Sequence, residues 1–379
     1  MQVSMLSFTP SNKIENEFKM LQGLFVERYR DLEDLSTDEA KFLNRFALIS
    51  NIGASTRIEN AVLTDPEIEW VDTVLNENGK TTAYDEKRTF ILDKLSKDRE
   101  RSIEEVVGCR QILTTIYLQA NEFFPLTEAV IRGFHHDLLR YYPEAASHAG
   151  GYKTASNRVV FINHDTGEHR VVLDPAPPGI ITSTAMAELV KWYNDTIRKH
   201  PWPLLVATEF VFRFLSIHPF QDGNGRLGRA LFILALLQSK DKYLTGISSF
   251  IAVDRHIEQN RSLYYTVLHQ CSAGKFQADP THYNLEPLAW FFIKVIKSSL
   301  TDFEFYRQKY TSLLKLSESS LAVLSCFKAA PEKRLKVAEI VTETGLPRRT
   351  VQYALNTLTK QDFLQLLGRG AASRYQLLF

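Results

Sequence analysis

Residues 218–229 read HPFQDGNGRLGR, and this polar, glycine-rich stretch joins two strongly apolar segments. PLLVATEFVFRFLSI precedes it at 203–217, and RLGRALFILALLQS overlaps its end at 226–239. Segments with so many apolar residues are typical of helices buried in a protein core. A polar junction between two buried helices needs a functional reason, so we place the candidate site here.

The junction carries groups that suit a polyphosphate. Gly223, Asn224 and Gly225 allow a sharp turn with exposed N–H groups, and the helix expected from about Arg226 presents its positive end to an anion. Arg226 and Arg229 lie three residues apart, so they project from one face of the first turn. Two guanidinium groups beside free amides indicate a polyphosphate ligand, not a single carboxylate.

Two further side chains of the stretch supply metal binding and acid–base chemistry. Asp222 offers a hard oxygen ligand for a Mg²⁺ that bridges phosphates. His218 ends the preceding helix, where it can act as a base near neutral pH. Together these groups indicate phosphoryl or nucleotidyl transfer to water or to a Ser, Thr or Tyr hydroxyl. The residues alone leave open which phosphorus is attacked.

The stretch resembles the motif of the Fic-domain family, HPFx(D/E)GNGRxxR, at every specified position. The resemblance covers about residues 40–300 and implies a mainly α-helical fold. It implies an adenylyltransferase that moves AMP from ATP to a hydroxyl side chain of a target protein. In this resemblance His218 would deprotonate the hydroxyl, Asp222 would hold Mg²⁺ between the α- and β-phosphates, and Phe220 would point into the core.

The same resemblance assigns the remaining residues of the motif. The amides around Gly223 and Gly225, with Asn224, would bind the phosphates of ATP. Arg226 would contact the inner phosphates and Arg229 the γ-phosphate. ATP and Mg²⁺ are therefore the expected substrate and cofactor.

Upstream, STRIEN at 55–60 resembles the inhibitory signature of the family, [S/T]xxxE[G/N]. Ser55 and Glu59 lie four residues apart, so both reach one side of a helical turn, and Asn60 completes the pattern. The resemblance implies an inhibitory helix at about 50–62 whose Glu59 pairs with Arg229 and withholds it from the γ-phosphate. A solvated glutamate at a helix end is the alternative.

A β-hairpin interrupts the helical sequence. Residues 158–162 and 169–173 are β-branched runs joined by a polar turn, within a segment at 150–179. The resemblance implies a flap on which an extended target segment docks by β-addition. A plain surface hairpin is the alternative.

Tyr264 and Tyr265 lie on a helix expected after the motif. The resemblance places aromatic side chains at the adenine face of the nucleotide. Neighbouring helical residues point about 100° apart, so only one of the two tyrosines can stack on the base. Simple core or surface tyrosines are the alternative.

Helical spacing dominates the other parts of the first 300 residues. Three- and four-residue steps of apolar residues predict helices at 38–50, 102–122, 127–140 and 184–200. Ser102 and Glu105 have the spacing of a capping box at the start of the second of these helices.

The C-terminal segment at 317–379 has the pattern of a winged helix-turn-helix. The expected elements are helices at 321–329, 337–344 and 348–360 and two short strands about 368–373. Nine basic and five acidic residues give this segment a net charge of +4. Arg348 and Arg349 begin the expected recognition helix and Arg369 lies at the wing tip, where such modules contact DNA. Protein docking or dimerisation is the alternative.

The whole chain of 379 residues carries 45 basic and 44 acidic residues, so any nucleic-acid or membrane binding requires a local patch. Three widely separated cysteines predict neither disulfides nor a thiolate zinc site, and they favour a reducing compartment. The N-terminus lacks the pattern of a secretory signal, and the longest strongly apolar run, 230–237, is too short for a bilayer span. We expect a cytoplasmic protein that binds no membrane.

We expect three parts: an N-terminal helical region at 1–100, a Fic core at 101–300 and the winged helix at 317–379.

Two competing functions remain at this point. One is removal of AMP, or transfer of another nucleotide, by the same fold. The other is a DNA-binding regulator whose Fic core senses a nucleotide. Self-modification and a homodimer are both compatible with the sequence.

Overall fold

The computed structural model describes residues 6–76, 82–95, 99–162, 169–370 and 373–378. The chain forms two compact units, one made of Met1–Ala61 and Glu104–Phe303, the other of Val62–Ile103 and Glu304–Phe379. Helices α5 (Glu100–Gln119) and α13 (Glu286–Leu314) contribute residues to both units. Helices predominate in each unit, so the expectation of a mainly α-helical fold is confirmed.

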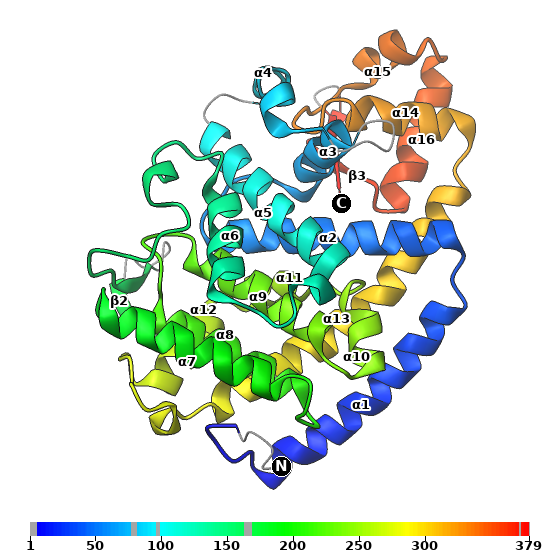
Figure 1. Cartoon of the computed structure of the whole chain (residues 1–379). Coiled ribbons are helices and arrows are strands. Elements are labelled where there is room, and N and C mark those ends of the chain that lie inside the picture. Colours follow the sequence, from blue (N-terminus) through cyan, green and yellow to red (C-terminus); the bar gives the residue numbers. More distant parts are fainter. Residues whose placement is uncertain (1–5, 77–81, 96–98, 163–168, 371–372, 379) are drawn as a thin grey trace. The chain divides into compact units, whose positions relative to one another are not determined.

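The first unit is built around α8 (Pro203–Ile217) and α9 (Asn224–Gln238), which lie beside each other and flank the candidate site (Figure 1). Almost every residue of both helices is buried, as their apolar sequences predict. The other helices of this unit are α1 (Asn12–Glu33), α2 (Thr37–Ile58), α6 (Glu128–Leu139), α7 (Ile180–Thr196), α10 (Lys242–Ser248), α11 (Val253–Gln259), α12 (Arg261–Ser272) and the short 3₁₀ helices η3 (Ala120–Phe123), η4 (Ala146–His148) and η5 (Pro280–His282).

Helix α2 is longer than the segment 38–50 that periodicity predicts. The Ser36 hydroxyl caps its N-terminus by accepting the N–H of Glu39. Its second half is buried on nearly all sides, so the three- to four-residue spacing of apolar residues that marks a surface helix is lost there. The helix ends at Ile58, and Asn60 follows in the left-handed conformation with a φ of 73°. Glu59 is thus placed at the cap of a rigid element.

The predicted hairpin is present. β1 (Val159–Ile162) pairs antiparallel with β2 (His169–Leu173), with Val160 opposite Val171. The turn at 163–168 lies outside the described residues. After β2, the N–H of Asp174 donates to the carbonyl of Gly274 at 2.8 Å and the Asp174 carbonyl accepts from Phe276 at 2.9 Å, which anchors the hairpin base to the segment after α12.

Several helix starts differ from expectation. Helix α5 begins at Glu100, so Ser102 and Glu105 lie inside it and the predicted capping box is wrong. Their side chains have other partners: Ser102 accepts the N–H of Val62, and Glu105 lies 3.6 Å from Arg226. Helix α9 begins at Asn224, about two residues before the expected start.

The second unit contains the C-terminal helices together with two helices from the segment after Ala61. Its elements are α3 (Asp65–Leu75), α4 (Tyr84–Lys94), α14 (Glu318–Lys328), α15 (Val337–Thr344), α16 (Arg348–Lys360), β3 (Leu364–Leu367) and β4 (Arg374–Leu377). An apolar core joins the three C-terminal helices to β3 and β4.

The two strands form an antiparallel wing with Leu364 opposite Leu377. They flank the segment 368–373 instead of lying in it, so the predicted strand positions are wrong. The strands are fixed by the apolar residues that reach the core, Leu364, Tyr375 and Leu377. Gly368 and Gly370 between them have positive φ angles of 80° and 64°, which favour a turn.

None of the described helices combines the length and apolar character required to cross a bilayer.

Candidate active site

His218 marks the end of α8. Its backbone has a φ of 50° and a ψ of 60°, a left-handed conformation that is uncommon for a residue with a side chain. The His218 N–H donates to the carbonyl of Phe214 at 2.9 Å. The turn sends the chain away from α8 and leaves the half-buried imidazole at the edge of the motif loop.

The N-terminus of α9 forms the floor of the site. Gly223 caps the helix in the left-handed conformation, with a φ of 75°. The first hydrogen bond of this helix is donated by Leu227 to the Gly223 carbonyl at 3.0 Å. The N–H groups of Asn224, Gly225 and Arg226 therefore precede the helical ladder, as expected for an anion-binding helix end.

Arg226 is buried with part of its hydrogen-bonding capacity unused. Its guanidinium lies 3.6 Å from both Glu105 and Asp222, distances that give charge attraction without a hydrogen bond. Among the described residues, Nε and Nη1 of Arg226 have no hydrogen-bond partner. Unsatisfied donors on a buried cation are costly, so this side chain could bind an anionic ligand.

Asp222 lies at the open side of the same helix end, with 45% of its side chain exposed. Its Oδ1 accepts the N–H of Gly223 at 2.6 Å. The carboxylate is held next to the free amides and remains accessible, a suitable position for a metal ligand shared with phosphate oxygens.

Arg229 is held by the end of α2. Its Nη2 donates to Glu59 Oε1 at 2.9 Å and to the Ser55 carbonyl at 2.7 Å, and its Nε donates to the Ser55 hydroxyl at 2.9 Å. Burial alone would lower the pKa of Arg229, but the charges of Glu59 and Asp254 raise it above its ordinary value. Arg229 is therefore a fixed cation whose partners come from the predicted inhibitory segment.

Asn60, the last residue of the signature at 55–60, binds Arg261 through its side chain. Its Oδ1 accepts from Arg261 Nη2 at 3.0 Å. Arg57 forms a two-pronged ion pair with Glu258, with Nε–Oε1 and Nη2–Oε2 distances of 2.7 and 2.9 Å. The end of α2 is thus fastened to α11 and α12 on both sides of Glu59.

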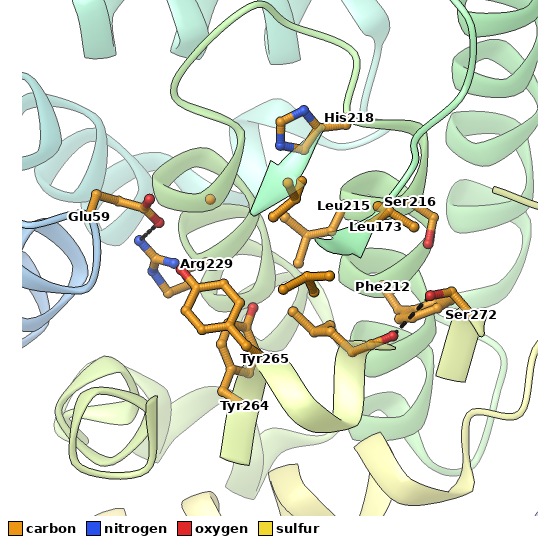
Figure 2. Close-up of a pocket in the computed structure, with 14 residues that line it drawn as sticks. Glu59, Leu173, Phe212, Leu215, Ser216, His218, Arg229, Tyr264, Tyr265 and Ser272 are labelled. Atoms are coloured by element: carbon orange, nitrogen blue, oxygen red, sulfur yellow. Dashed lines mark hydrogen bonds and ion pairs between the residues drawn. The ribbon is translucent and has the colours of Figure 1, made fainter. Parts of the chain in front are cut away.

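A single cavity brings many of these side chains together (Figure 2). Glu59, His218, Gly225 and Arg229 line one part of it, and Figure 2 shows the Glu59 carboxylate turned toward Arg229. Hairpin, α8 and α12 residues line the rest: Val159, Val172, Leu173, Phe212, Leu215, Ser216, Tyr264, Tyr265, Leu268 and Ser272. The cavity has a charged end beside α9 and a mainly apolar body.

Tyr264 and Tyr265 both line this cavity, with ring centroids 5.6 Å apart and planes at 55°. Tyr264 is buried and packs against Phe291, whereas Tyr265 is only partly buried. Burial and then the charge of Glu59 raise the pKa of Tyr265 to about 12, so its hydroxyl stays protonated. Tyr265 is the more accessible of the two to a ligand.

The His218 imidazole is embedded in amides. Its Nδ1 lies 2.9 Å from Asn157 Nδ2 and 3.2 Å from Asn224 Nδ2. Burial, and next the charge of Lys153, lower the pKa of His218 to about 3, against the opposing charge of Asp222. The ring is therefore neutral over the physiological pH range, the form in which an imidazole can accept a proton.

His135, on α6, supports the motif loop from behind. Its Nδ1 accepts the N–H of Gly150 at 2.8 Å, so the proton on its Nε2 is donated to the Asp222 carbonyl at 3.0 Å. The ring stacks on Phe220, with centroids 3.8 Å apart. Phe220 is fully buried, as the resemblance implies. Burial lowers the pKa of His135 to about 4.

Sequence reasoning missed four residues of the site: Glu105, His135, Lys153 and Asn157. They come from chain segments far from the motif, and no spacing rule connects them to it. The one available signal was that Lys153 and Asn157 precede the predicted hairpin, on which the target was expected to dock. Glu105 was assigned to a cap because its spacing from Ser102 imitates one.

Comparisons with known proteins identify the family. The Fic/DOC family model matches residues 125–236. A Fido domain-containing protein of Dictyostelium discoideum is 33% identical over 104 residues, which cover 24% of this chain and 69% of that protein. The chain belongs to the Fic/DOC family. The family model of the IclR helix-turn-helix domain matches residues 319–368, in the C-terminal part of this Fic chain.

Two further comparisons are more distant. The protein adenylyltransferase fic-1 of Caenorhabditis elegans is 26% identical over 148 residues, or 39% of this Fic chain and 24% of the worm protein. The chain thus spans about a quarter of that relative. A crystal structure of a Fic family protein from Desulfovibrio desulfuricans aligns with a TM-score of 0.56 at 21% identity, covering 99% of this chain and 98% of the other. This likeness concerns the fold alone.

Proposed function

We propose that this Fic chain is a nucleotidyltransferase that moves AMP from ATP to a hydroxyl side chain of a target protein. The observation that carries the proposal is the pairing of a free helix N-terminus with the buried, incompletely bonded guanidinium of Arg226. These groups suit a chain of phosphates, and they lie at the charged end of a cavity whose apolar body suits a nucleobase.

In the proposed reaction the target hydroxyl oxygen attacks the α-phosphorus of ATP. A bond forms between that oxygen and the phosphorus, the bond to the bridging oxygen of the β-phosphate breaks, and pyrophosphate leaves. His218 accepts the hydroxyl proton and later releases it to solvent or to the leaving group. Its neutral ring at physiological pH is compatible with this role.

The phosphates would be held by the N–H groups of Asn224 and Gly225, by Arg226 at the inner positions and by Arg229 at the γ-phosphate. Asp222 would hold Mg²⁺, which would supply neutralisation of the phosphate charge. In the part of the chain that the structure describes, no group of three or more His, Cys, Asp and Glu side chains could hold a metal. One accessible carboxylate plus substrate phosphates is a common set of Mg²⁺ ligands.

The proposal includes autoinhibition by Glu59. Its carboxylate already neutralises Arg229, the cation assigned to the γ-phosphate, and it lies next to Gly225 at the helix N-terminus. A triphosphate can use these groups only after Glu59 moves. Misplacement of the nucleotide by even a small distance slows transfer strongly, because transfer requires alignment of the attacking and leaving oxygens.

The target would dock on the hairpin. The side chains of Val160 and Val171 lie opposite each other and are about half exposed. Within the ranges that the structure describes, no strand pairs with the outer edge of β1, so its backbone groups could pair with an extended peptide, whereas β2 packs against α12 and its Val172 carbonyl lies 3.1 Å from His269 Nδ1. Docking there would bring a hydroxyl toward the cavity, which Val159 and Leu173 of the hairpin also line.

The decisive experiment is incubation with Mg²⁺ and ATP or GTP carrying a label on the α-phosphate, in the presence of a protein extract. We expect covalent label from ATP on protein, more of it with Glu59→Gly, and none with His218→Ala, which should still bind the nucleotide. Label from GTP alone would assign another nucleotide. Release of AMP from a pre-modified protein, without any forward transfer, would assign the reverse reaction.

A second candidate function is DNA binding by the C-terminal unit. Helix α16 presents one exposed polar face, with Arg348, Arg349, Gln352, Tyr353, Asn356 and Lys360. Arg369 and Arg374 at the wing are also exposed. A gel shift with duplex DNA in the absence of nucleotide, abolished by the double change Arg348→Ala and Arg349→Ala, would support a DNA-binding regulator. An unshifted duplex at low salt would favour a protein-docking module.

A further inference from the structure

The segment that leads into the hairpin carries a buried lysine. Lys153 is 3% exposed, and its ammonium group donates to the Ile217 carbonyl at 3.1 Å and to Asn157 Oδ1 at 3.0 Å. Its backbone N–H donates to the carbonyl of Pro219 at 2.8 Å. Lys153 thus holds the carbonyls on both sides of His218 and also determines how the Asn157 amide is oriented.

With its oxygen facing Lys153, Asn157 must direct its NH₂ group the other way. Asn157 Nδ2 donates to the Phe220 carbonyl at 2.8 Å and lies 2.9 Å from His218 Nδ1. Asn224 is oriented in the same manner, since its Oδ1 accepts the Phe220 N–H at 3.0 Å and its Nδ2 donates to the Phe220 carbonyl at 2.7 Å. Two amide donors therefore face one ring nitrogen.

This arrangement determines the tautomer of His218. A nitrogen that accepts from two N–H groups carries no proton, so the neutral ring carries its proton on Nε2. A protonated Nε2 cannot take the proton of a target hydroxyl. In serine hydrolases, where an aspartate normally accepts from Nδ1–H, an asparagine in its place favours the wrong tautomer and costs on the order of 10⁴-fold in rate.

We propose that Asn157, oriented by Lys153, is a positioning residue that holds His218 in the Nε2–H tautomer, and that transfer requires the Asn157 amide to turn its oxygen toward Nδ1. The inference rests on the proposed role of His218 as the base. Lys153 opposes the rotation, because the turned amide would offer its ammonium group an N–H instead of an oxygen. The device is separate from Glu59, which acts on the nucleotide site.

The first test requires no substitution in the segment. The chain is labelled with ¹⁵N-histidine, and the ring nitrogens of His218 are assigned by comparison with His218→Gln. Long-range ¹H–¹⁵N spectra distinguish a protonated from an unprotonated ring nitrogen. We expect Nε2 protonated and Nδ1 unprotonated near pH 7. A protonated Nδ1 in the unaltered chain would overturn the inference.

The second test is Asn157→Asp in the Glu59→Gly background. Aspartate has nearly the size of asparagine but offers only acceptors, and Asn224 still donates to the Phe220 carbonyl. We expect the ring proton to move to Nδ1 and kcat for AMP transfer to rise by about tenfold or more, with an unchanged KM for ATP. An unchanged tautomer, or a change confined to KM, would contradict the proposal.

Asn157→Leu is the matched control. It removes the Asn157 donor and supplies no acceptor, while Asn224 continues to face Nδ1, so the Nε2–H tautomer should persist and kcat should not rise. A rise equal to that of Asn157→Asp would indicate simple loosening of the segment and would refute the tautomer mechanism. If the spectra behave as expected but no variant transfers a nucleotide, the tautomer inference stands and the proposed function fails.

Discussion

The Glu59 carboxylate lies against Gly225 so closely that a methyl group on that glycine would overlap Glu59 Oε1. Gly225 belongs to the first turn of α9, where the backbone N–H groups are free for an anion. In the proposed function, Glu59 therefore lies where a phosphate oxygen would bind, and it also pairs with Arg229, the cation assigned to the γ-phosphate. Under this proposal, the Glu59 carboxylate thus competes with a phosphate for this site.

Removing this carboxylate should activate the protein. We expect Glu59→Gly to raise AMP transfer by about tenfold or more, because Arg229 and the end of α9 become available to the triphosphate. Initial rates with labelled ATP measure the effect. Glu59→Gln, which keeps the shape but not the charge, should give a smaller rise. Equal rates for the parent and Glu59→Gly would remove the autoinhibition claim.

Adding bulk at the same place should be harmful even without Glu59. A Cβ on Gly225 would also lie 3.3 Å from Arg229 Nη1, so it would crowd the position assigned to a phosphate. In the Glu59→Gly background we expect Gly225→Ala to lower transfer by about a hundredfold and to weaken ATP binding. Isothermal titration and initial rates check both effects. Full activity in the double variant would show that no phosphate sits there.

The ion pair between Arg57 and Glu258 should tune inhibition from outside the nucleotide site. It fastens the end of α2 to α11, next to Glu59. Glu258→Gln weakens the pair, so we expect a rise in basal transfer of about two- to fivefold, smaller than for Glu59→Gly. The control is Asp31→Asn, which weakens a comparable pair with Arg28 on α1. A similar rise in the control would argue against a specific role.

Stability should fall in mild acid through His135. The pKa of this histidine is about 4 in the folded chain against an ordinary value of 6.5, so the unfolded chain binds more protons between these limits. Folding stability is therefore complete above about pH 6.5 and declines as the pH falls toward 4. At pH 5 the ceiling for one such group is about 2 kcal/mol.

Urea unfolding at pH 7 and pH 5 measures this effect. His135→Gln should be less stable at pH 7, since it loses the stacking on Phe220, but its stability should change less between the two pH values. His218, whose pKa is also lowered, contributes in the same direction in both proteins. An identical loss in parent and variant would mean that His135 does not carry the dependence.

The motif could be interpreted from sequence because its chemistry is local. The glycine turn, the free amides and Arg226 lie within one turn of helix, so residue spacing alone predicts their geometry. The contact of Glu59 with Arg229 was accessible only through the family resemblance, since 170 residues separate the two. The one sequence signal for Asn157 was its place just before the predicted hairpin, because its role depends on a lysine and a histidine that meet it only in the folded chain.

The helix boundaries illustrate the same limit. Periodicity predicted an end of α2 at residue 50. Beyond this point the helix is buried on nearly all sides, so the amphipathic signal disappears. The predicted capping box failed because Ser102 and Glu105 lie inside a helix, where the same spacing has no capping function. The wing strands were displaced because glycines were assigned to strands when they form the turn between them.

The place where the chain leaves its first unit has a mechanical consequence. Only Asn60 and Ala61 separate Glu59 from Val62, the first residue of the unit that also contains the winged helix. Rotation about the backbone bonds of Asn60 would change the position of the Glu59 carboxylate relative to the segment that begins at Val62. Glu59 is thus only three peptide bonds away from the unit that also contains the IclR-type module.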